Sequence, residues 1–399
     1  MQFMTSENLK KKLILAGGGH AHVMVLKKLA QMPLPGFELT LISESAEQLY
    51  SGMLPGYIRG AYKKEEITFD LRKLCGKVGV QFIEAKITGF DKGKRLVKVR
   101  RSAGHFKHSA DDKTSIERTE KTERHNESIE YDLLSVNLGA QPSWSGPIYH
   151  FKPFHLFLEV WEKILSANQP RIAVVGGGAA GVELSLAMNE VIKPKGGHLN
   201  LYEKQDRLVA CWPEGASQII LDRLRKDGVE VQLAQEVRLN SEFTQNFDFI
   251  FGADGPNPPE VVQSSGWSLD DKGYLLVDPY LRVLNEGHVF ATGDMVTFSS
   301  KPHPKSGVYA IRQSEVLCEN LWREAERLLR TKPLGPNEPT QKAKTEHLKA
   351  FRPQKTAMYI LNLGRKEALL VKGSWFFKSR WVWKLKDCID RRFMRTGQC

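Results

Sequence analysis

A glycine-rich turn between a predicted strand and a predicted helix occurs twice in this chain, and no other feature constrains its fold as strongly. The first turn is GGGHAH at 17–22, preceded by the apolar run KLILA at 12–16. Apolar residues at helical spacing follow from 23 to 31, and FELTLI at 37–42 has the composition of a second strand. Strand, turn, helix and strand in this order form a βαβ unit, so we expect a parallel sheet here.

The same order returns around GGGAAG at 176–181. RIAVV at 171–175 precedes this turn, helical spacing continues from 182 to 191, and HLNLY at 198–202 follows as a strand. The two turns lie too far apart for a solenoid repeat. We therefore expect two whole α/β domains, each with its own nucleotide-binding unit.

GGGAAG fits the G-x-G-x-x-G pattern of dinucleotide-binding turns, and each glycine has a physical role. Gly176 permits the tight turn, Gly178 lets the backbone approach a pyrophosphate, and Gly181 lets the helix pack closely on the strand. The N-terminus of the helix offers N–H groups and a partial positive charge to the anion. The motif predicts a bound dinucleotide.

An acidic residue at the end of the following strand indicates which dinucleotide is bound. Glu203 can accept hydrogen bonds from an adenosine ribose. This favours NADH, because the 2′-phosphate of NADPH would meet a carboxylate. Lys204 and Arg207 follow closely and keep NADPH open.

The first turn is less regular than the second. Gly17 and Gly19 are in place, but His22 occupies the position usually held by a third small residue. The acidic residue after the second strand is also displaced, so Glu44 or Ser43 must contact the ribose. A glycine-rich turn without a ligand is the alternative interpretation.

HVFATGD at 288–294 places a carboxylate, Asp294, after a short predicted strand. A carboxylate in this position can bind the hydroxyls of a flavin's ribityl chain, or it can simply cap a loop. KSGV at 305–308 then leads into a helical stretch from 309 to 329. The start of that helix could face a flavin ring and stabilise negative charge on its reduced form.

The net charge of +12 over 399 residues is concentrated at the C-terminal end. Residues 351–399 contain twelve Lys or Arg and three Asp or Glu, which gives 12 − 3 = +9. No helix-turn-helix, zinc-finger or aromatic-basic RNA motif occurs, so no nucleic-acid partner is expected. No run of about eighteen apolar residues and no signal-like start occur, so we expect a cytoplasmic chain.

The basic C-terminal region is expected to form two strands, at 357–363 and 368–377, followed by a helix at 381–394. One face of this helix carries Trp381, Leu385, Cys388, Ile389 and Phe393. Such a helix can lie in a membrane interface, or it can pack this face on its own domain. Two further segments are too polar to form a core. They are a charged insertion at 100–130, which could contact a partner, and a linker at 331–348.

Several segments resemble a known class of flavoproteins. LLSVNLGAQP (133–142), DFIFGADGPNPP (248–259) and HVFATGD, with the two turns, resemble the flavoproteins with two dinucleotide-binding domains of the pyridine nucleotide-disulfide oxidoreductase superfamily. Other segments resemble a narrower group, the type II NADH dehydrogenase-like flavoproteins, including those fused to selenide, water dikinase. These segments are GGGHAHV (17–23), LYSGMLPGYIRGAY (49–62), FDLRKL (69–74), KSGVYAIRQ (305–313) and WKLKDCIDRRFM (383–394).

The resemblance implies FAD in the first domain and NAD(P)H in the second. The residues that it assigns to FAD are Gly17, Gly19, His20, Ala21, Glu44, Lys86, Gly139, Gly293 and Asp294, and His22, Pro55, Gly307 and Val308 are further residues expected to bind a cofactor. Those that it assigns to NAD(H), with NADP(H) left open, are Gly176, Gly178, Ala179, Ala180, Gly181, Glu183, Glu203 and Gly252. No metal site is expected.

The implied fold is α/β, with two Rossmann-like domains, the second inserted in the first, and a small α+β domain at the C-terminal end. The FAD-binding domain is expected at 1–150 and 285–345, and the NAD(P)H-binding domain at 151–284. The basic C-terminal domain is expected at 346–399.

Disulfide-reducing members of the superfamily carry a Cys-x4-Cys pair beside the flavin. Residues 50–56 contain no cysteine, so electrons are expected to leave the flavin directly. Cys211 and Cys318 could match the widely spaced cysteines of sulfide:quinone oxidoreductases, but packed thiols are the favoured interpretation. His20 and His22 are expected to position the backbone or a phosphate. No catalytic residue is assigned, because hydride transfer needs proximity and orientation above all.

The leading hypothesis is an enzyme that passes a hydride from NADH to FAD and then electrons to a quinone or another small acceptor. One alternative is a redox sensor or assembly protein that binds both cofactors and turns over slowly. Another is a reductase associated with selenium metabolism. Contact of the C-terminal region with the cytoplasmic membrane face and a homodimer are left open.

Overall fold

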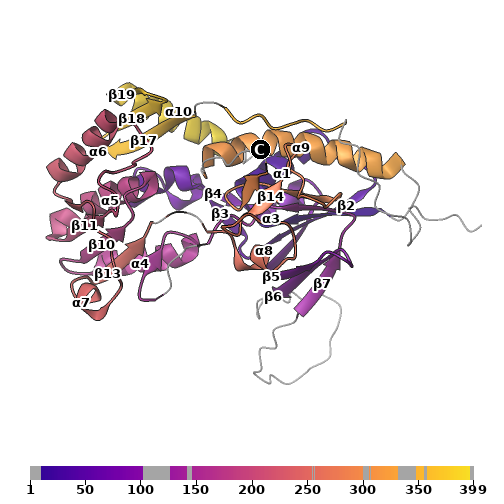
Figure 1. Ribbon diagram of the computed structural model, residues 1–399, viewed down its shortest axis with the longest axis horizontal. Helices are drawn as coiled ribbons and strands as arrows, with labels where there is room; N and C mark the ends of the chain where they lie inside the picture. Colours follow the sequence, from indigo (N-terminus) through magenta and orange to yellow (C-terminus); the bar gives the residue numbers. More distant parts are fainter. Residues whose placement is uncertain are drawn as a thin grey trace, which may run out of the picture. The chain divides into compact units, whose positions relative to one another are not determined.

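The computed structural model describes residues 10–101, 126–141, 146–253, 255, 257–299, 305, 307–330, 347–354 and 357–395. These residues form two compact units (Figure 1). The first unit draws on Met1–Gln48, Asp70–Gly139 and Pro258–Arg352, and the second on Leu49–Phe69, Ala140–Asn257 and Pro353–Cys399. Each unit is therefore assembled from three separate stretches of the chain.

The first unit is built on a seven-stranded sheet in the order β15-β8-β1-β2-β5-β6-β7. The neighbours from β15 to β5 run parallel, and β6 and β7 are added antiparallel. β1 and β8 are apolar and fully buried over most of their length, as expected of strands covered on both faces. The bounds are β15 (Val289–Ala291), β8 (Leu133–Val136), β1 (Lys11–Ala16), β2 (Phe37–Ser43), β5 (Gln81–Asp91), β6 (Leu96–Arg101) and β7 (Asn126–Glu130).

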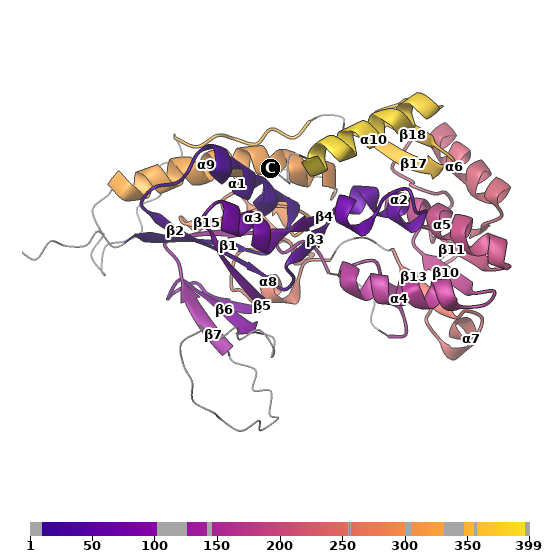
Figure 2. The same cartoon turned by 180° about the vertical axis from the view of Figure 1, so that it is seen from behind.

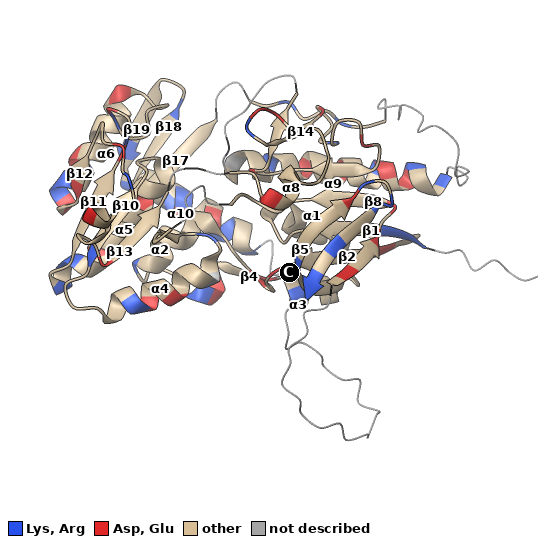
Figure 3. Ribbon diagram, turned by 60° about the horizontal axis from the view of Figure 1, so that its bottom comes forward, with Lys and Arg blue, Asp and Glu red and all other residues tan. Residues whose placement is uncertain are grey.

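Four helices pack around this sheet. α1 contacts both α9 and α3, while α3 and α8 contact β5. Both acidic and basic residues occur along α9 (Figure 3). A second parallel pair, β14 with β16, belongs to this unit, and a small sheet of β3 and β4 lies where the chain passes between the units. The bounds are α1 (His20–Gln31), α3 (Leu71–Lys77), α8 (Glu260–Gln263), α9 (Gly307–Arg330), β14 (Leu275–Val277), β16 (Val296–Phe298), β3 (Glu47–Leu49) and β4 (Thr68–Asp70).

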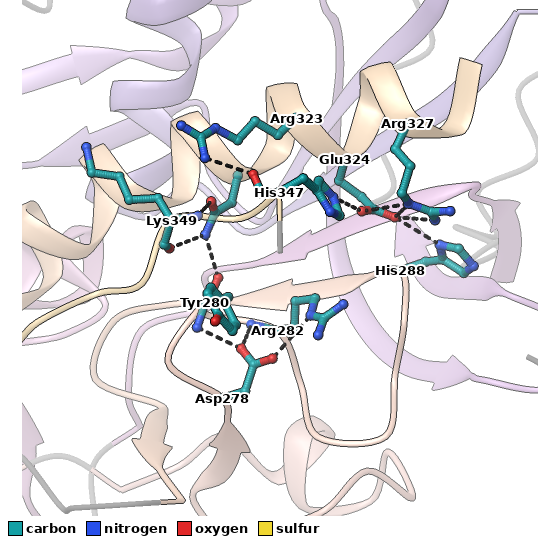
Figure 4. A network of polar contacts seen from close by, with 10 residues as sticks. Asp278, Tyr280, Arg282, His288, Arg323, Glu324, Arg327, His347 and Lys349 are labelled. Carbon is teal, nitrogen blue, oxygen red and sulfur yellow. Dashed lines mark hydrogen bonds and ion pairs between the residues drawn. The ribbon is translucent and has the colours of Figure 1, made fainter. Parts of the chain in front are cut away.

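Polar contacts fix residues 347–349 onto α9 (Figure 4). Glu324, on α9, is fully buried and accepts hydrogen bonds from Arg327. Its Oε2 lies 3.1 Å from Nε2 of His347. One turn earlier, the amide of Asn320 donates to the carbonyl of Lys349 and accepts from its N–H, at 2.9 and 2.7 Å. A buried carboxylate needs such partners, so this network holds the returning chain in place.

The second unit contains a parallel five-stranded sheet in the order β12-β11-β10-β13-β9. α5 crosses from β10 to β11 and contacts both strands, which completes a βαβ unit. The strand bounds are β12 (Glu230–Gln232), β11 (His198–Tyr202), β10 (Arg171–Val175), β13 (Phe249–Gly252) and β9 (Tyr149–His150). The helix bounds are η1 (Ser51–Met53), α2 (Leu54–Ile58), η2 (Lys64–Glu66), α4 (Phe154–Ser166), α5 (Ala179–Ile192), η3 (Lys193–Lys195), α6 (Glu214–Asp227) and α7 (Ser241–Thr244).

The C-terminal region forms an antiparallel sheet of three strands, where the sequence predicts two. These strands are β17 (Met358–Gly364), β18 (Glu367–Lys372) and β19 (Trp375–Ser379). Gly373 has a positive φ of 60° and turns the chain inside the second predicted strand. The last helix, α10 (Arg380–Arg395), lies against β17 and β18 (Figure 2).

The predicted apolar face of α10 points away from the protein. Trp381 is 76% exposed, and Leu385 and Ile389 are also well exposed. Packing of this face on its own domain is therefore a wrong prediction, except for Phe393, whose ring contacts those of Tyr50 and Phe69. The opposite face of α10 carries the residues that contact the protein.

The predicted fold class is confirmed: both units contain a βαβ nucleotide-binding sheet, and a small α+β region follows. The compact units do not follow the expected boundaries. Residues 49–69 and 353–399 belong with 140–257, because α5 packs on both α2 and β17. The division by cofactor stays a prediction. Most of the charged insertion at 100–130 and of the linker at 331–348 lies outside the described residues.

Candidate cofactor-binding site

The first glycine turn leaves no room for side chains. Gly17 has a φ of +102°, and a Cβ on it would lie 2.4 Å from the carbonyl oxygen of Asn137. A Cβ on Gly19 would lie 1.9 Å from Oδ1 of Asn137. Gly19 caps α1 without a side-chain hydrogen bond, and no acidic residue stands in the first turn of this helix. The N-terminus of α1, at His20 and Ala21, thus keeps the partial positive charge that favours an anion.

Asn137 also ties this turn to the predicted ribityl site. Its Nδ2 donates to the carbonyl of Thr292 at 2.9 Å. Gly293 has a φ of +88°, and a Cβ on it would lie 2.6 Å from the same Nδ2. The N–H of Gly293 donates to Gln313 of α9 at 2.8 Å. Asp294 follows, half-buried, so the structure brings it together with the first turn.

Sequence reasoning missed Asn137 and Gln313 as organisers of this site. Asn137 is the polar residue directly after the apolar strand β8, at the carboxyl edge where ligands bind in open parallel sheets. The position of Asn137 in the sequence could therefore have identified it as a site residue. Gln313 lies within α9 and gives no comparable signal, because only the fold brings it beside Gly293.

His22 has a structural role in the first turn. Its ring is fully buried, with Nδ1 2.6 Å from the carbonyl oxygen of Gly17 and Nε2 2.8 Å from the hydroxyl of Ser135. Because a carbonyl only accepts, Nδ1 donates and Nε2 accepts from Ser135. Burial lowers the pKa of His22 to about 4. The neutral imidazole, hydrogen-bonded through both ring nitrogens, positions the turn, and the assignment of His22 to a cofactor stays a prediction.

The two candidates for the first ribose contact differ in their orientation. Ser43 is buried, and its Oγ would lie 2.6 Å from a Cβ on Gly18, so the hydroxyl is directed at the turn. Glu44 is exposed one residue further on. The turn itself is thus contacted by Ser43, and the assignment of Glu44 to FAD stays a prediction.

The second turn has the same construction but is more open. Gly176 has a φ of +118°, and a Cβ on Gly181 would lie 1.9 Å from its carbonyl oxygen. A Cβ on Gly178 would meet no described atom within 4 Å. Gly178, Ala179 and Ala180 are exposed at the start of α5. This is the arrangement that lets a pyrophosphate approach the backbone.

Glu203 lies against this turn. Its Oε2 accepts a hydrogen bond from Gly177 N at 2.6 Å, and its Oε1 accepts from Gln205 N at 2.8 Å. The carboxylate is held by two backbone groups and fixed at the end of β11. Arg207, which kept NADPH open, donates instead to the carbonyl of Ala210 at 2.7 Å.

The remaining predicted residues fall into two groups. In the first group, Gly252 is the last residue of β13 and Gly307 the first of α9, Gly139 follows β8, and Lys86 lies within β5. Lys86 lies two residues beyond Glu84, which pairs with Ser43 at the carboxyl end of β2. Gly252 ends β13, beside Val175. The side chain of Val308 lies outside the described residues.

Pro55 and Glu183 are placed elsewhere than at a glycine turn. Pro55 is buried in α2. Glu183 belongs to the start of α5, but its Oε1 accepts a hydrogen bond from the backbone of Asn362 in β17 at 2.6 Å. Neither position tests their assignment to a cofactor.

Lys305 is a cation that the sequence analysis did not assign to the site. Its Nζ donates to the carbonyl of Val296 and lies 4.3 Å from the centre of the Tyr274 ring. Burial lowers the pKa of Lys305 to about 8, although the charges of Asp270 and Asp294 oppose this shift. Asp294 is therefore one of two carboxylates whose charge favours the protonated form of Lys305.

The four cysteines within the described residues are all free thiols. Cys75 and Cys318 are buried, which raises the pKa of each to about 12. Cys211 and Cys388 are exposed. A pKa this high makes Cys318 a packed thiol with little thiolate character.

The residues of both turns fit the phosphates of a dinucleotide. Close contacts exclude any side chain from the glycines at 17, 19 and 181, while the space above Gly178 is open. Two such turns, with Asp294 beside the first, define a protein that binds two dinucleotide cofactors.

Comparisons with known proteins identify the family. Residues 11–314 match the family model of the pyridine nucleotide-disulphide oxidoreductases, and the chain belongs to this family. It is an FAD-dependent NAD(P)H oxidoreductase, as the sequence analysis predicts.

Individual relatives are distant. The chain is 23% identical over 327 residues to the NADH dehydrogenase-like protein YutJ of Bacillus subtilis, covering 78% of this chain and 83% of that one. It is 22% identical over 341 residues to the demethylphylloquinone reductase NdbB of Synechocystis, with 78% and 79% covered. The solved structure of NDH2 from Plasmodium falciparum in complex with NADH matches with a TM-score of 0.68 at 14% identity, covering 97% of each chain.

Proposed function

We propose that this enzyme oxidises NADH by hydride transfer to FAD and then reduces a quinone without a redox-active cysteine pair. The observation that carries the proposal is the pair of dinucleotide turns combined with a sequence at 50–56 that has no cysteine. With no dithiol beside the flavin, electrons pass from the reduced flavin to the acceptor directly.

The choice of NADH rests on Glu203. Both of its oxygens are held by backbone N–H groups at the second turn, so the carboxylate is fixed where a ribose would lie. A 2′-phosphate brought to this position would meet a negative charge that cannot turn away.

The choice of a quinone rests on two supports. Among the relatives, NdbB is named as a demethylphylloquinone reductase. The C-terminal region also carries an exposed apolar surface formed by Trp375, Phe377, Trp381, Leu385 and Ile389, bordered by basic residues such as Lys378 and Lys384. Aromatic rings beside basic residues suit the interface of an anionic membrane, where quinones dissolve.

This surface would make the protein a peripheral membrane enzyme. Within the described ranges, no helix is both long and apolar enough to cross a bilayer. The membrane is therefore reached from outside, through α10 and β19. The likeness to the group fused to selenide, water dikinase remains a prediction from the sequence alone.

When bound, FAD supplies the chemistry of accepting a hydride and releasing electrons. The chain's own residues bind and orient the cofactors. The glycine turns hold the phosphates at the N-termini of α1 and α5, Asp294 is available for the ribityl hydroxyls, and Glu203 for the ribose of NADH.

Rapid mixing tests the proposal in two stages. The protein is first mixed anaerobically with one equivalent of NADH and then with menadione. We expect the flavin to be reduced in the first stage and reoxidised, with quinol formed, in the second. Sustained turnover would separate an enzyme from a slow redox sensor. Flavin that stays reduced after menadione is added would exclude the quinone as acceptor.

A further inference from the structure

The two glycine turns are held in place by different contacts. A turn of glycines is permissive, because without a Cβ its peptide groups can rotate. In the second unit, the peptide that joins Gly176 to Gly177 is held on both sides. Its N–H donates to Oε2 of Glu203 at 2.6 Å, and its carbonyl oxygen lies against Gly181, where a Cβ would come within 1.9 Å. The carboxylate and the closely packed helix together keep this peptide in one orientation.

The equivalent peptide of the first unit joins Gly17 to Gly18, and it is held differently. Ser43, a neutral residue, is directed at Gly18 in place of a carboxylate. On the carbonyl side, the third small residue of the motif is replaced by His22. Nδ1 of the His22 ring donates to the carbonyl oxygen of Gly17 at 2.6 Å. The imidazole therefore fixes by a hydrogen bond the carbonyl that the second unit fixes by close packing.

Ser135 determines how the ring of His22 is oriented. Its hydroxyl donates to Nε2 of His22 at 2.8 Å, and both residues are fully buried. Burial lowers the pKa of His22 to about 4, so in neutral solution the ring has one donor and one acceptor. Because the hydroxyl of Ser135 occupies the acceptor, the donor on Nδ1 is left for the carbonyl of Gly17. Ser135 thus selects the tautomer that fixes the turn.

This polar pair lies in apolar surroundings. Ser135 belongs to β8, and its neighbours in the sheet are Leu15 of β1 and Phe290 of β15. A small residue at position 22, as in the second unit, would bury no imidazole there. Burying a hydroxyl and an imidazole costs free energy unless both are hydrogen-bonded. The pair occurs at the turn that lacks the carboxylate, and this correspondence calls for a functional explanation.

We propose that His22 and Ser135 are positioning residues for FAD, which fix the Gly17–Gly18 peptide so that the N–H of Gly18 stays available to the adenosine ribose. The carbonyl and the N–H of one planar peptide point in opposite directions, so a bond that fixes the first also fixes the second. Without the imidazole, the peptide rotates to find another partner for its buried carbonyl. FAD then binds a turn that is only partly in the competent orientation, and its apparent affinity falls.

The inference rests on the assignment of FAD to the first turn and does not depend on the electron acceptor. The test measures how much FAD leaves the holoprotein on dilution, from the fluorescence of the released flavin. His22→Leu keeps an apolar group of similar size and removes both hydrogen bonds. We expect its dissociation constant for FAD to rise about tenfold or more, because a buried carbonyl loses its donor. Its affinity for NADH should not change.

A conservative variant separates the hydrogen bond from the packing of the ring. His22→Asn places an amide nitrogen where Nδ1 stands, so it should retain most of the FAD affinity that His22→Leu loses. Ser135→Ala leaves Nδ1 facing the carbonyl of Gly17 and should give a smaller loss than His22→Leu. This variant removes a single hydroxyl, so it carries the test if His22→Leu does not fold.

Ser217→Ala is the matched control in the second unit. Ser217 is also buried, and its hydroxyl donates to the carbonyl of Leu208 at 2.7 Å. The change removes a comparable hydrogen bond to the backbone and should leave FAD retention as it is in the unmodified protein. A loss of FAD equal to that of His22→Leu would show that any such destabilisation releases the cofactor, and would overturn the proposal.

The other outcomes are distinguishable. Unchanged retention in His22→Leu, or an equal loss in His22→Leu and His22→Asn, would leave the ring a packing role and overturn the proposal. Release of FAD by Gly178→Ala, with none by His22→Leu, would place FAD at the second turn and reject the assignment itself. Flavin that is retained in the unmodified protein but is not reduced by NADH would instead reject the proposed function.

Discussion

Ser43 in the first unit holds the position that Glu203 holds in the second. In each unit the N–H of the turn's first glycine donates, at 2.8 Å, to the carbonyl of the residue that precedes Ser43 or Glu203. A Cβ on Gly18 would lie 2.6 Å from the hydroxyl of Ser43, and one on Gly177 would lie 2.9 Å from Cβ of Glu203. The two turns are built alike and differ at this point by one charge.

Replacing that charge should change the nucleotide preference. Glu203→Ser gives the second turn the residue of the first and removes hydrogen bonds to a carboxylate, each worth about 1.5–3 kcal/mol. We expect kcat/KM for NADH to fall about tenfold or more, and the preference over NADPH to shrink. Steady-state kinetics with both nucleotides measure this. Ser43→Ala, the matched control, should leave the NADH to NADPH ratio unchanged. An unaltered ratio in Glu203→Ser would contradict the assignment.

Two glycines of the second turn should respond differently to the same methyl group. Gly181→Ala places a Cβ 1.9 Å from the carbonyl of Gly176, so we expect a loss of stability of about 1–3 kcal/mol. The Cβ added by Gly178→Ala meets no described atom, so this variant should keep the melting temperature of the unmodified protein while its affinity for NADH falls. Thermal denaturation and nucleotide titration measure the two effects. Equal destabilisation by both changes would show that the space above Gly178 is not a ligand site.

His22 should make folding stability dependent on pH. Its pKa of about 4 in the folded chain lies below the ordinary 6.5. Between these values the unfolded chain binds a proton that the folded chain does not, so stability falls as pH drops from 6.5 towards 4 and is unaffected above 6.5. The loss should reach roughly 3 kcal/mol.

The measurement is urea denaturation at several pH values. His22→Gln keeps a side-chain donor for the Gly17 carbonyl but cannot titrate. Its stability should lack this part of the pH dependence. The same slope in the variant and the unmodified protein would show that His22 does not titrate in this way.

The exposed surface of α10 and β19 should bind anionic membranes. Trp375 and Trp381 are each 76% exposed, so replacing both with Ser should leave the melting temperature unchanged and lower binding to phosphatidylserine vesicles several-fold. Vesicle sedimentation at low salt measures this. Met32→Ser is the control, because Met32 is also exposed but lies in the first unit. If the double variant bound vesicles as well as the unmodified protein, the proposed membrane contact through this surface would be wrong.

Much of the fold and part of the site could be predicted from the sequence. The glycine turns and the strands around them are local patterns, because a tight turn requires glycine and a buried strand requires an apolar run. Asn137 shows what could not be predicted, since its hydrogen bonds to the carbonyls of Ala16 and Thr292 depend on strand order.

The C-terminal helix, α10, shows more clearly what could not be predicted from the sequence. Periodicity shows which residues of α10 share a face, but not which face meets the protein. The buried face is the charged one, because Tyr50 and Gly52, far away in the sequence, provide its hydrogen-bonding partners. No local pattern contains that information.

The central claim is that both cofactors bind this chain and exchange a hydride. The most direct measurement is the absorption spectrum of the purified protein before and after anaerobic addition of NADH. We predict the visible bands of an oxidised flavin, and their loss within the mixing time of a manual experiment. A colourless protein that stays so after incubation with FAD, or flavin bands that persist with excess NADH, would contradict the account.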